Sequence, residues 1–252
     1  MMRPGTPHIA SLKRTLAMLE AVIADAGENN VTALSRQVDM PLATAHRQVA
    51  TLVAEGYLAP VGKGRHLAGP RLLGLLHRLD EKQVIANVAA PVLHRLAHHL
   101  RAIAQLGTFE NDMVTYRIKT GRGASDLFTK VGMQLEAYCS GIGKVLLAHL
   151  PVPERERYLA GGPFVALTSR TITAPDLLRE ELDRVQRQGF ARDDGEISEM
   201  LHCLAVPIHT PDGGVPAAIS VSLADAARMQ RDDVPALLQD AARQIEQAAF
   251  PA

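Results

Sequence analysis

The sequence is poor in cysteine, lacks a long apolar run and carries no net charge, and each absence excludes a class of protein. Its 252 residues include two cysteines, Cys139 and Cys203, too few for a disulfide framework and not spaced as a metal-binding CxxC pair. No stretch approaches the roughly 20 apolar residues that cross a membrane. The first ten residues lack the apolar segment of a secretory signal, so we expect a cytoplasmic protein with no membrane partner.

The zero net charge conceals an asymmetry along the chain. Residues 1–80 contain nine Lys and Arg against six Asp and Glu, and the remainder carries the opposite excess of three charges. A basic N-terminal third indicates nucleic acid as the partner of that part alone, although so small an excess also occurs in ordinary domains. With 47% hydrophobic and 21% charged residues, the chain is expected to fold around packed cores.

Three helices are predicted in the first third of the chain. The first, about residues 9–26, has a face of apolar residues at helical spacing, with Ser11 as its cap and Gly27 as its end. That face consists of Ile9, Leu12, Leu16, Leu19 and Ile23. A second helix over 32–38, capped by Thr32, is broken by Asp39-Met40-Pro41. The third helix, 42–55, is expected to turn inward Leu42, Ala45, Val49, Leu52 and Val53.

A short hairpin is predicted next. Residues 57–60 and a return strand starting at His66 flank the basic turn Gly62-Lys63-Gly64-Arg65. Three helices followed by a hairpin with a cationic tip are typical of a winged helix-turn-helix. A connecting helix over 71–80 follows, whose leucines we interpret as a contact between two copies of the chain, the alternative being packing onto its own C-terminal domain. They are Leu72, Leu73, Leu75, Leu76 and Leu79.

Strands and helices mix in the last 150 or so residues, which predicts an α+β domain. Strands are expected over 102–109, 113–120, 190–193, 201–209 and 215–223. Helices are expected over 84–100, 141–150, 154–159, 175–188 and 234–249. The predicted organisation is therefore a DNA-binding domain at 1–70, a linker helix at 71–83 and a second domain at 84–252.

The third helix is the candidate reader of double-stranded DNA. A recognition helix lies in the major groove and offers side chains to base edges. Arg47 suits guanine, Gln48 suits adenine, and the Thr44 methyl suits thymine. The predicted DNA-binding residues are Ser35, Arg36, Ala43, Thr44, His46, Arg47, Gln48, Lys63 and Arg65. A solvated surface helix is the alternative interpretation.

A ligand pocket is predicted in the second domain. Ser220 and Ser222 lie two apart on a strand, so both hydroxyls point to one side. Gly141-Ile142-Gly143 opens a helix whose free N–H groups and positive dipole end suit a carboxylate. Two plainer interpretations stay open: neighbouring backbone satisfies the serines, and Ser140 caps the helix.

An enzyme using Cys203 and Asp193, with His202, is the rival hypothesis. His202 and Cys203 are neighbours on a strand, so their side chains point to opposite faces, which argues against a nucleophile–base pair. His94 and His98 share a helix face without an HExxH glutamate. We therefore expect no catalytic residue, no metal and no cofactor.

The whole chain resembles the IclR family of bacterial transcriptional regulators. The similarity lies in the ordered stretches 11–16, 34–35, 41–47, 55–58, 140–148, 192–196, 203–208 and 218–222. It implies a winged helix-turn-helix, a linker helix and a GAF-like ligand-binding domain, assembled as a homodimer or a dimer of dimers. After Ser222 the chain has Leu-Ala-Asp where the family usually has Gly-Pro, and Ala43 stands where a hydroxyl or lysine is common.

The resemblance also implies that the second domain binds a small carboxylic or aromatic acid that controls affinity for a DNA operator. The family's effector pocket maps onto nine positions of this chain: Leu127, Leu135, Gly141, Ile142, Asp193, Leu201, Cys203, Ser220 and Ser222. The four aliphatic residues would form an apolar wall, and the polar groups would hold the carboxylate.

Overall fold

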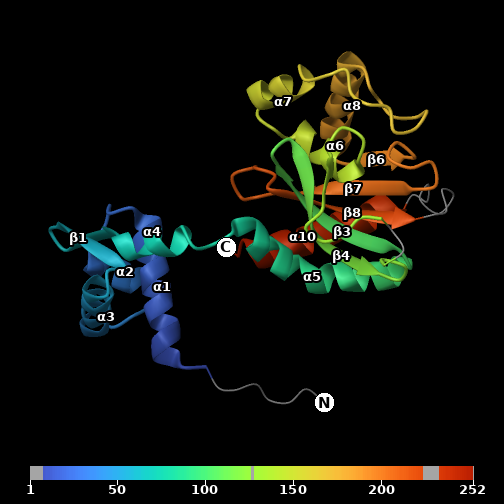
Figure 1. The fold of residues 1–252 in the computed structure, drawn as a ribbon. Helices are drawn as coiled ribbons and strands as arrows, with labels where there is room; N and C mark the ends of the chain where they lie inside the picture. Colours follow the sequence, from blue (N-terminus) through green and yellow to red (C-terminus); the bar gives the residue numbers. More distant parts are fainter. Residues whose placement is uncertain (1–7, 126–127, 224–232, 252) are drawn as a thin grey trace, which may run out of the picture. The chain divides into compact units, whose positions relative to one another are not determined.

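The computed structural model describes residues 8–125, 128–223 and 233–251, which form two compact units with the boundary between Asp80 and Glu81 (Figure 1). Each unit has its own apolar core. Within the described residues, no helix is long and apolar enough to cross a membrane.

The N-terminal unit contains three helices, an antiparallel hairpin and a short fourth helix. In order these are α1 (Ala10–Asp25), α2 (Val31–Gln37), α3 (Leu42–Ala54), β1 (Leu58–Gly62), β2 (Arg65–Ala68) and α4 (Pro70–Leu76). Met18, Val22, Leu34, Val49 and Leu58 are among the side chains of its core. This is the winged helix-turn-helix that the sequence predicts.

The helix ends differ in detail from the prediction. The cap of α2 is Asn30, whose side chain accepts a hydrogen bond from the Ala33 N–H at 3.0 Å, and not Thr32. Ile9 precedes α1 without a side-chain cap, so the cap expected from Ser11 is wrong. The predicted break between α2 and α3 is present, and Asp39 there has a left-handed φ of 49°.

The apolar face that the sequence marks on α1 is not the face that packs inside this unit. Ile9, Leu12 and Leu16 are 66%, 55% and 49% exposed, whereas Met18 and Val22 are fully buried. The helix therefore carries two apolar stripes: α2, α3 and β2 cover the one with Met18 and Val22, and of the predicted stripe Leu19 alone packs against this core within the described residues.

The connecting helix is shorter than predicted. It ends at Leu76 and not near residue 80, and the next helix, α5 (Glu81–Leu100), begins earlier than expected. Four of the five predicted leucines are exposed: Leu73, Leu75, Leu76 and Leu79. Together with Ala68, Gly69, Pro70 and Leu72 they line an apolar groove on the N-terminal unit.

The C-terminal unit is built on a six-stranded antiparallel sheet with the order β5-β4-β3-β8-β7-β6. The strands are β3 (Ile103–Glu110), β4 (Met113–Gly121), β5 (Gln134–Glu136), β6 (Ala191–Asp194), β7 (His202–Ile208) and β8 (Ala217–Leu223). All were predicted to within a few residues except β5, whose three residues are too few for a periodic pattern. The α+β class is confirmed.

Helices cover both faces of this sheet (Figure 1). On one face α5 and α10 (Asp233–Ala249) enclose a core with Leu106, Leu204 and Ile219. On the other face α6 (Gly141–Ala148) and α8 (Pro175–Gln188) enclose a core with Tyr116, Ala205 and Ala218. Helix α7 (Val152–Leu159) packs beside α8. The predicted pocket residues that the structure describes therefore lie on the α6 side of the sheet.

Candidate functional sites

The outer face of α3 is the first candidate site. Ala43, His46 and Arg47 are exposed, and Thr44 is half-buried. Leu42 is 43% exposed, so its predicted inward orientation is wrong, whereas Ala45, Val49 and Leu52 do point inward. The Arg47 guanidinium has no hydrogen bond or ion pair to any residue in the described part of the chain, which leaves it free to bind another molecule.

Two of the predicted DNA-binding residues, Ser35 and Gln48, have side-chain atoms buried within the N-terminal unit. Ser35 is buried and its hydroxyl donates to the Thr32 carbonyl at 2.9 Å. The Oε1 atom of Gln48 is also buried, with no hydrogen-bond partner among the described residues. Arg36 next to Ser35 is exposed. The structure therefore favours Arg36 over Ser35 as a group that reaches a phosphate.

The hairpin turn presents one free lysine. Gly62, Lys63 and Gly64 all have positive φ values, of 90°, 52° and 71°, and the two glycines adopt such values without steric cost. Lys63 is exposed at the tip. Arg65 is only half-exposed because its guanidinium donates to the Gly27 carbonyl at 3.3 Å. The Val31 N–H donates to the Gly64 carbonyl at 3.1 Å and ties the turn to α2.

The second candidate site is a small enclosed pocket between α6 and the sheet. Its free volume is about 10 Å³, the space of about one water molecule. Twelve residues line it: Gln105, Tyr116, Phe128, Thr129, Ser140, Gly141, Ile142, Asp193, Ile197, Leu201, Cys203 and Ser220. Six of the nine predicted residues thus meet around one space, which must enlarge to admit an organic acid.

The three other predicted pocket residues are placed differently. Leu127 lies outside the described residues. Leu135, on β5, packs against the core beneath α6 and does not line the pocket. Ser222 does not line the pocket, but its hydroxyl contacts Cys203 and Gln105, which do. Gln105, Tyr116 and Thr129 line the pocket but were not predicted. The only signal for Gln105 is a polar residue inside an otherwise apolar strand pattern, and Thr129 lies in the segment before β5, outside any strand.

A chain of buried polar groups runs behind and into the pocket. The Cys203 thiol lies 3.1 Å from the Ser222 hydroxyl, which donates to Gln105 Oε1 at 3.3 Å. The Gln105 amide in turn donates to Thr129 Oγ1 at 2.9 Å. Ser220 and Ser222 are buried on the face opposite Ile219, as strand alternation predicts. Neighbouring side chains, and not the backbone, hold the Ser222 hydroxyl.

The start of α6 forms one wall of the pocket. The Ser140 hydroxyl caps the helix by accepting a hydrogen bond from the Gly143 N–H at 3.0 Å. The interpretation that Ser140 caps the helix is therefore correct for that amide, which is not free to bind a carboxylate. Gly143 has no space for a side chain, because a Cβ there would lie 2.1 Å from the Ala137 carbonyl oxygen. Gly141 and Ile142 line the pocket itself.

Asp193 is the charged residue of the pocket lining, and burial raises its pKa to about 6. Its Oδ1 accepts a hydrogen bond from the Glu196 N–H at 2.7 Å, which closes a tight turn after β6. The Thr168 and Thr171 hydroxyls hold the same turn by donating to the Glu196 carbonyl at 3.3 and 2.7 Å. The position of Asp193 in the pocket therefore depends on this turn.

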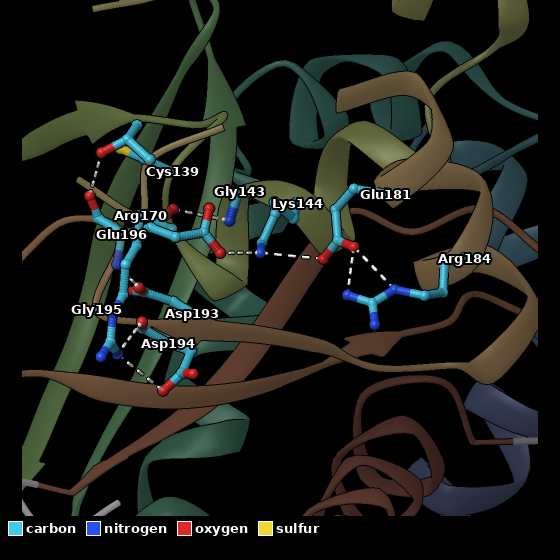
Figure 2. A network of polar contacts seen from close by, with 12 residues as sticks. Cys139, Gly143, Lys144, Arg170, Glu181, Arg184, Asp193, Asp194, Gly195 and Glu196 are labelled. Carbon is cyan, nitrogen blue, oxygen red and sulfur yellow. Dashed lines mark hydrogen bonds and ion pairs between the residues drawn. The ribbon is translucent and has the colours of Figure 1, made fainter. Parts of the chain in front are cut away.

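A buried ionic network anchors that turn to α6 and α8 (Figure 2). Lys144 is 1% exposed, and its ammonium contacts Glu181 Oε1 at 3.1 Å and also Glu196 Oε1. Glu181 further accepts from Arg184. Burial raises the pKa of Glu196 to about 7. The pKa of Glu181 is instead lowered, because Lys144 and Arg184 outweigh the effect of its burial. The Oε2 atom of Glu196 is buried without a hydrogen-bond partner among the described residues.

The geometry does not favour the rival enzyme hypothesis. Burial raises the pKa of the Cys203 thiol, which disfavours the nucleophilic thiolate. His202 Nδ1 lies 2.6 Å from Asp194, so this imidazole is paired away from Cys203. His94 pairs with Thr120 at 3.2 Å. Within the described residues, no three His, Cys, Asp or Glu side chains are grouped to hold a metal ion.

Comparisons with known proteins match both units. Residues 11–62 match the IclR helix-turn-helix domain, and residues 77–247 match the family described as bacterial transcriptional regulator IclR C-terminal. The Pca regulon regulatory protein of Pseudomonas putida is 32% identical over 221 residues, which cover 86% of this chain and 76% of that protein.

Solved structures of similar proteins share the fold. The Agrobacterium tumefaciens repressor BlcR is 25% identical with a TM-score of 0.70, and the match covers 96% of this chain and 97% of that one. An IclR homolog from Microbacterium hydrocarbonoxydans, solved in complex with 4-hydroxybenzoate, is 28% identical with a TM-score of 0.61. That match covers 95% of this chain and 99% of the homolog.

Proposed function

This chain belongs to the IclR family of DNA-binding transcriptional regulators, and from that premise we propose that a small organic acid, bound in its C-terminal pocket, controls its affinity for an operator. In this proposal residues 1–70 bind DNA, residues 71–83 link the parts, and residues 84–252 bind the effector. The observation that carries it is that one chain combines an exposed Arg47, whose guanidinium has no partner among the described residues, with a pocket of mixed polar and apolar lining in a separate unit.

The DNA-binding part of the proposal assigns different tasks to α3 and the hairpin. Arg47, together with His46 and Thr44, reads base edges in the major groove. Lys63 at the tip of the turn, with Arg36 and Arg65, binds the phosphate backbone, which positions the domain without reading sequence. Loss of a base contact changes the sequence preference, whereas loss of a phosphate contact changes the salt dependence of binding, so measurements can separate the two roles.

Binding of the Arg47→Ala and Lys63→Ala variants to DNA tests these roles. Arg47→Ala is expected to cost about 1–3 kcal/mol on the preferred duplex and to relax the preference at one base pair. Lys63→Ala is expected to weaken binding to all duplexes alike and to flatten the salt dependence by about one unit. If neither variant loses affinity in gel-shift titrations, α3 is not the recognition helix.

The effector part of the proposal rests on the chemistry and size of the pocket. Hydroxyl and amide groups of Ser220, Thr129 and Gln105 surround it, and the amides at the start of α6 suit a carboxylate. A relative of known structure was solved with 4-hydroxybenzoate. Because the free volume is only about 10 Å³, binding requires the lining to move, and a ligand that prefers the enlarged state shifts the population toward it.

Thermal-shift screening with small carboxylates and aromatic acids tests this part, since a ligand that binds only the folded state raises the apparent melting temperature. The double variant Ser220→Ala/Ser222→Ala should lose the response of DNA binding to any acid found, while its DNA affinity without that acid is unchanged. A retained response in this variant would place the effector elsewhere.

We further propose that the chain works as a homodimer or a dimer of dimers. A palindromic operator needs two recognition helices about 34 Å apart, which a single chain does not supply. The exposed leucines of α4 and the exposed apolar stripe of α1 are the surfaces in the N-terminal unit that a second copy would cover. Sedimentation equilibrium tests this point, and a monomer at micromolar concentration would contradict it.

A further inference from the structure

The outer face of α3 is unusual in its composition. Residues 40–54 contain no Asp or Glu, so nothing on the helix repels a phosphate backbone. Three alanines, Ala43, Ala50 and Ala54, are exposed on this helix. Small side chains let a helix approach the floor of a groove closely, and the long side chains that remain then determine which bases are read.

Leu42 is a large apolar side chain that is exposed at the start of this helix. It is the first residue of α3, directly after Pro41, and 43% of it is exposed. The residues that pack this helix against the core are Ala45, Val49 and Leu52, so Leu42 is not needed to close the N-terminal core. It lies at the end of a recognition helix that meets the base edges in a helix-turn-helix complex.

An apolar side chain in the major groove can recognise one feature of the bases. Thymine exposes a C5-methyl group there, and the other edge groups are hydrogen-bond donors or acceptors. We propose, resting on the DNA-binding function above, that Leu42 is a specificity-determining residue that contacts a thymine methyl group in the operator. Arg47, one turn further along the helix, reads a different base pair.

The position of Leu42 distinguishes this proposal from an ordinary exposed leucine. Isolated exposed leucines are normal on protein surfaces and need no function. Leu42, however, precedes Ala43 and lies about one turn from His46 and Arg47, on a helix without acids. Against thymine, a leucine in the groove removes mainly an apolar methyl group from water. Against a guanine or adenine edge, the same leucine would remove hydrogen-bonding groups from water and leave them unpaired.

Replacement of thymine by deoxyuridine tests the contact, because it removes only the methyl group. The full-length protein first selects its preferred sites from a random duplex library, and each thymine of the selected site is then replaced in turn. The wild type should lose about fourfold in affinity at one thymine, the factor that corresponds to burying one methyl group. The Leu42→Ala variant should bind the unmodified site about fourfold more weakly and show no further loss at that thymine.

Leu177→Ala is the matched control, because Leu177 is an exposed leucine on α8 in the C-terminal unit. This variant should retain the full loss caused by deoxyuridine. If the wild type selects a site whose thymines all tolerate the replacement, the proposal for Leu42 is overturned while DNA binding stands. If Leu42→Ala keeps the same sensitivity, another side chain contacts the methyl group. If no site is selected at all, the proposed function itself fails.

Discussion

Replacement of the buried Glu196 by glutamine should remove one cause of the loss of stability that the C-terminal unit suffers as the pH rises from 5 to 8. Burial raises the pKa of this carboxyl from its ordinary value of 4.5 to about 7. The folded protein therefore binds a proton that the unfolded chain releases between these two pH values. The stability that this protonated group contributes is fully present below pH 4.5 and is lost as the pH rises through 7.

The size of this effect follows from the two pKa values. At about 1.4 kcal/mol for each pH unit, the interval from 4.5 to 7 corresponds to about 3 kcal/mol, most of it between pH 5 and pH 8. Glutamine is uncharged at every pH, so Glu196→Gln should gain stability relative to the wild type by about this amount on going from pH 5 to pH 8.

Urea unfolding of the full-length protein at pH 5 and pH 8 measures the difference. The chain has no tryptophan, and three of its four tyrosines, Tyr116, Tyr138 and Tyr158, belong to the C-terminal unit, so tyrosine fluorescence reports mainly on that unit. Glu180→Gln, an exposed glutamate on α8, controls for the loss of a surface charge. A change in stability that is the same at both pH values for Glu196→Gln would refute the reasoning.

Three further substitutions test the packing of α6, which holds Gly143 and Lys144, and of α4 in the predicted linker. Lys144→Met removes the buried cation that contacts Glu196 and should lower the free energy of unfolding by about 3–5 kcal/mol, measured by urea titration at pH 7.5. Gly143→Ala should cost about 3 kcal/mol, because its Cβ would lie 2.1 Å from the Ala137 carbonyl oxygen; an unchanged melting temperature would contradict this. Gly74→Ala, in the open on α4, should instead raise stability by up to about 1 kcal/mol in the same melting experiment.

Local sequence patterns were enough to predict most of the secondary structure, because these elements are defined by short-range periodicity. Helix α8 occupies the predicted residues, and the strands β7 and β8 differ by one or two residues. The errors occur where two patterns compete. On α1 both a Leu/Ile stripe and the Met18 and Val22 stripe have helical spacing, and only packing against α2, α3 and β2 shows which one is inside.

The candidate pocket illustrates the limit of sequence reasoning more sharply. Gly141, Asp193 and Ser220 were identified by resemblance and do line one space. Gln105 and Thr129 were missed, because they come from β3 and from the segment before β5, and nothing in the local sequence indicates that these segments meet β8. The volume of the pocket was likewise beyond the sequence, because it depends on how side chains from several strands and a helix pack.

The order of helices and strands, the basic N-terminal third, the turn residues and the membership of a regulator family could all be predicted without a structure, because each depends on the residue types along a short stretch of chain. The folded structure was needed to show that Leu42 is exposed while Ser35 is buried, and that Lys144 is buried between Glu181 and Glu196. The physical reason is that burial and charge pairing depend on segments far apart in the chain, which meet only once the sheet and its covering helices have packed.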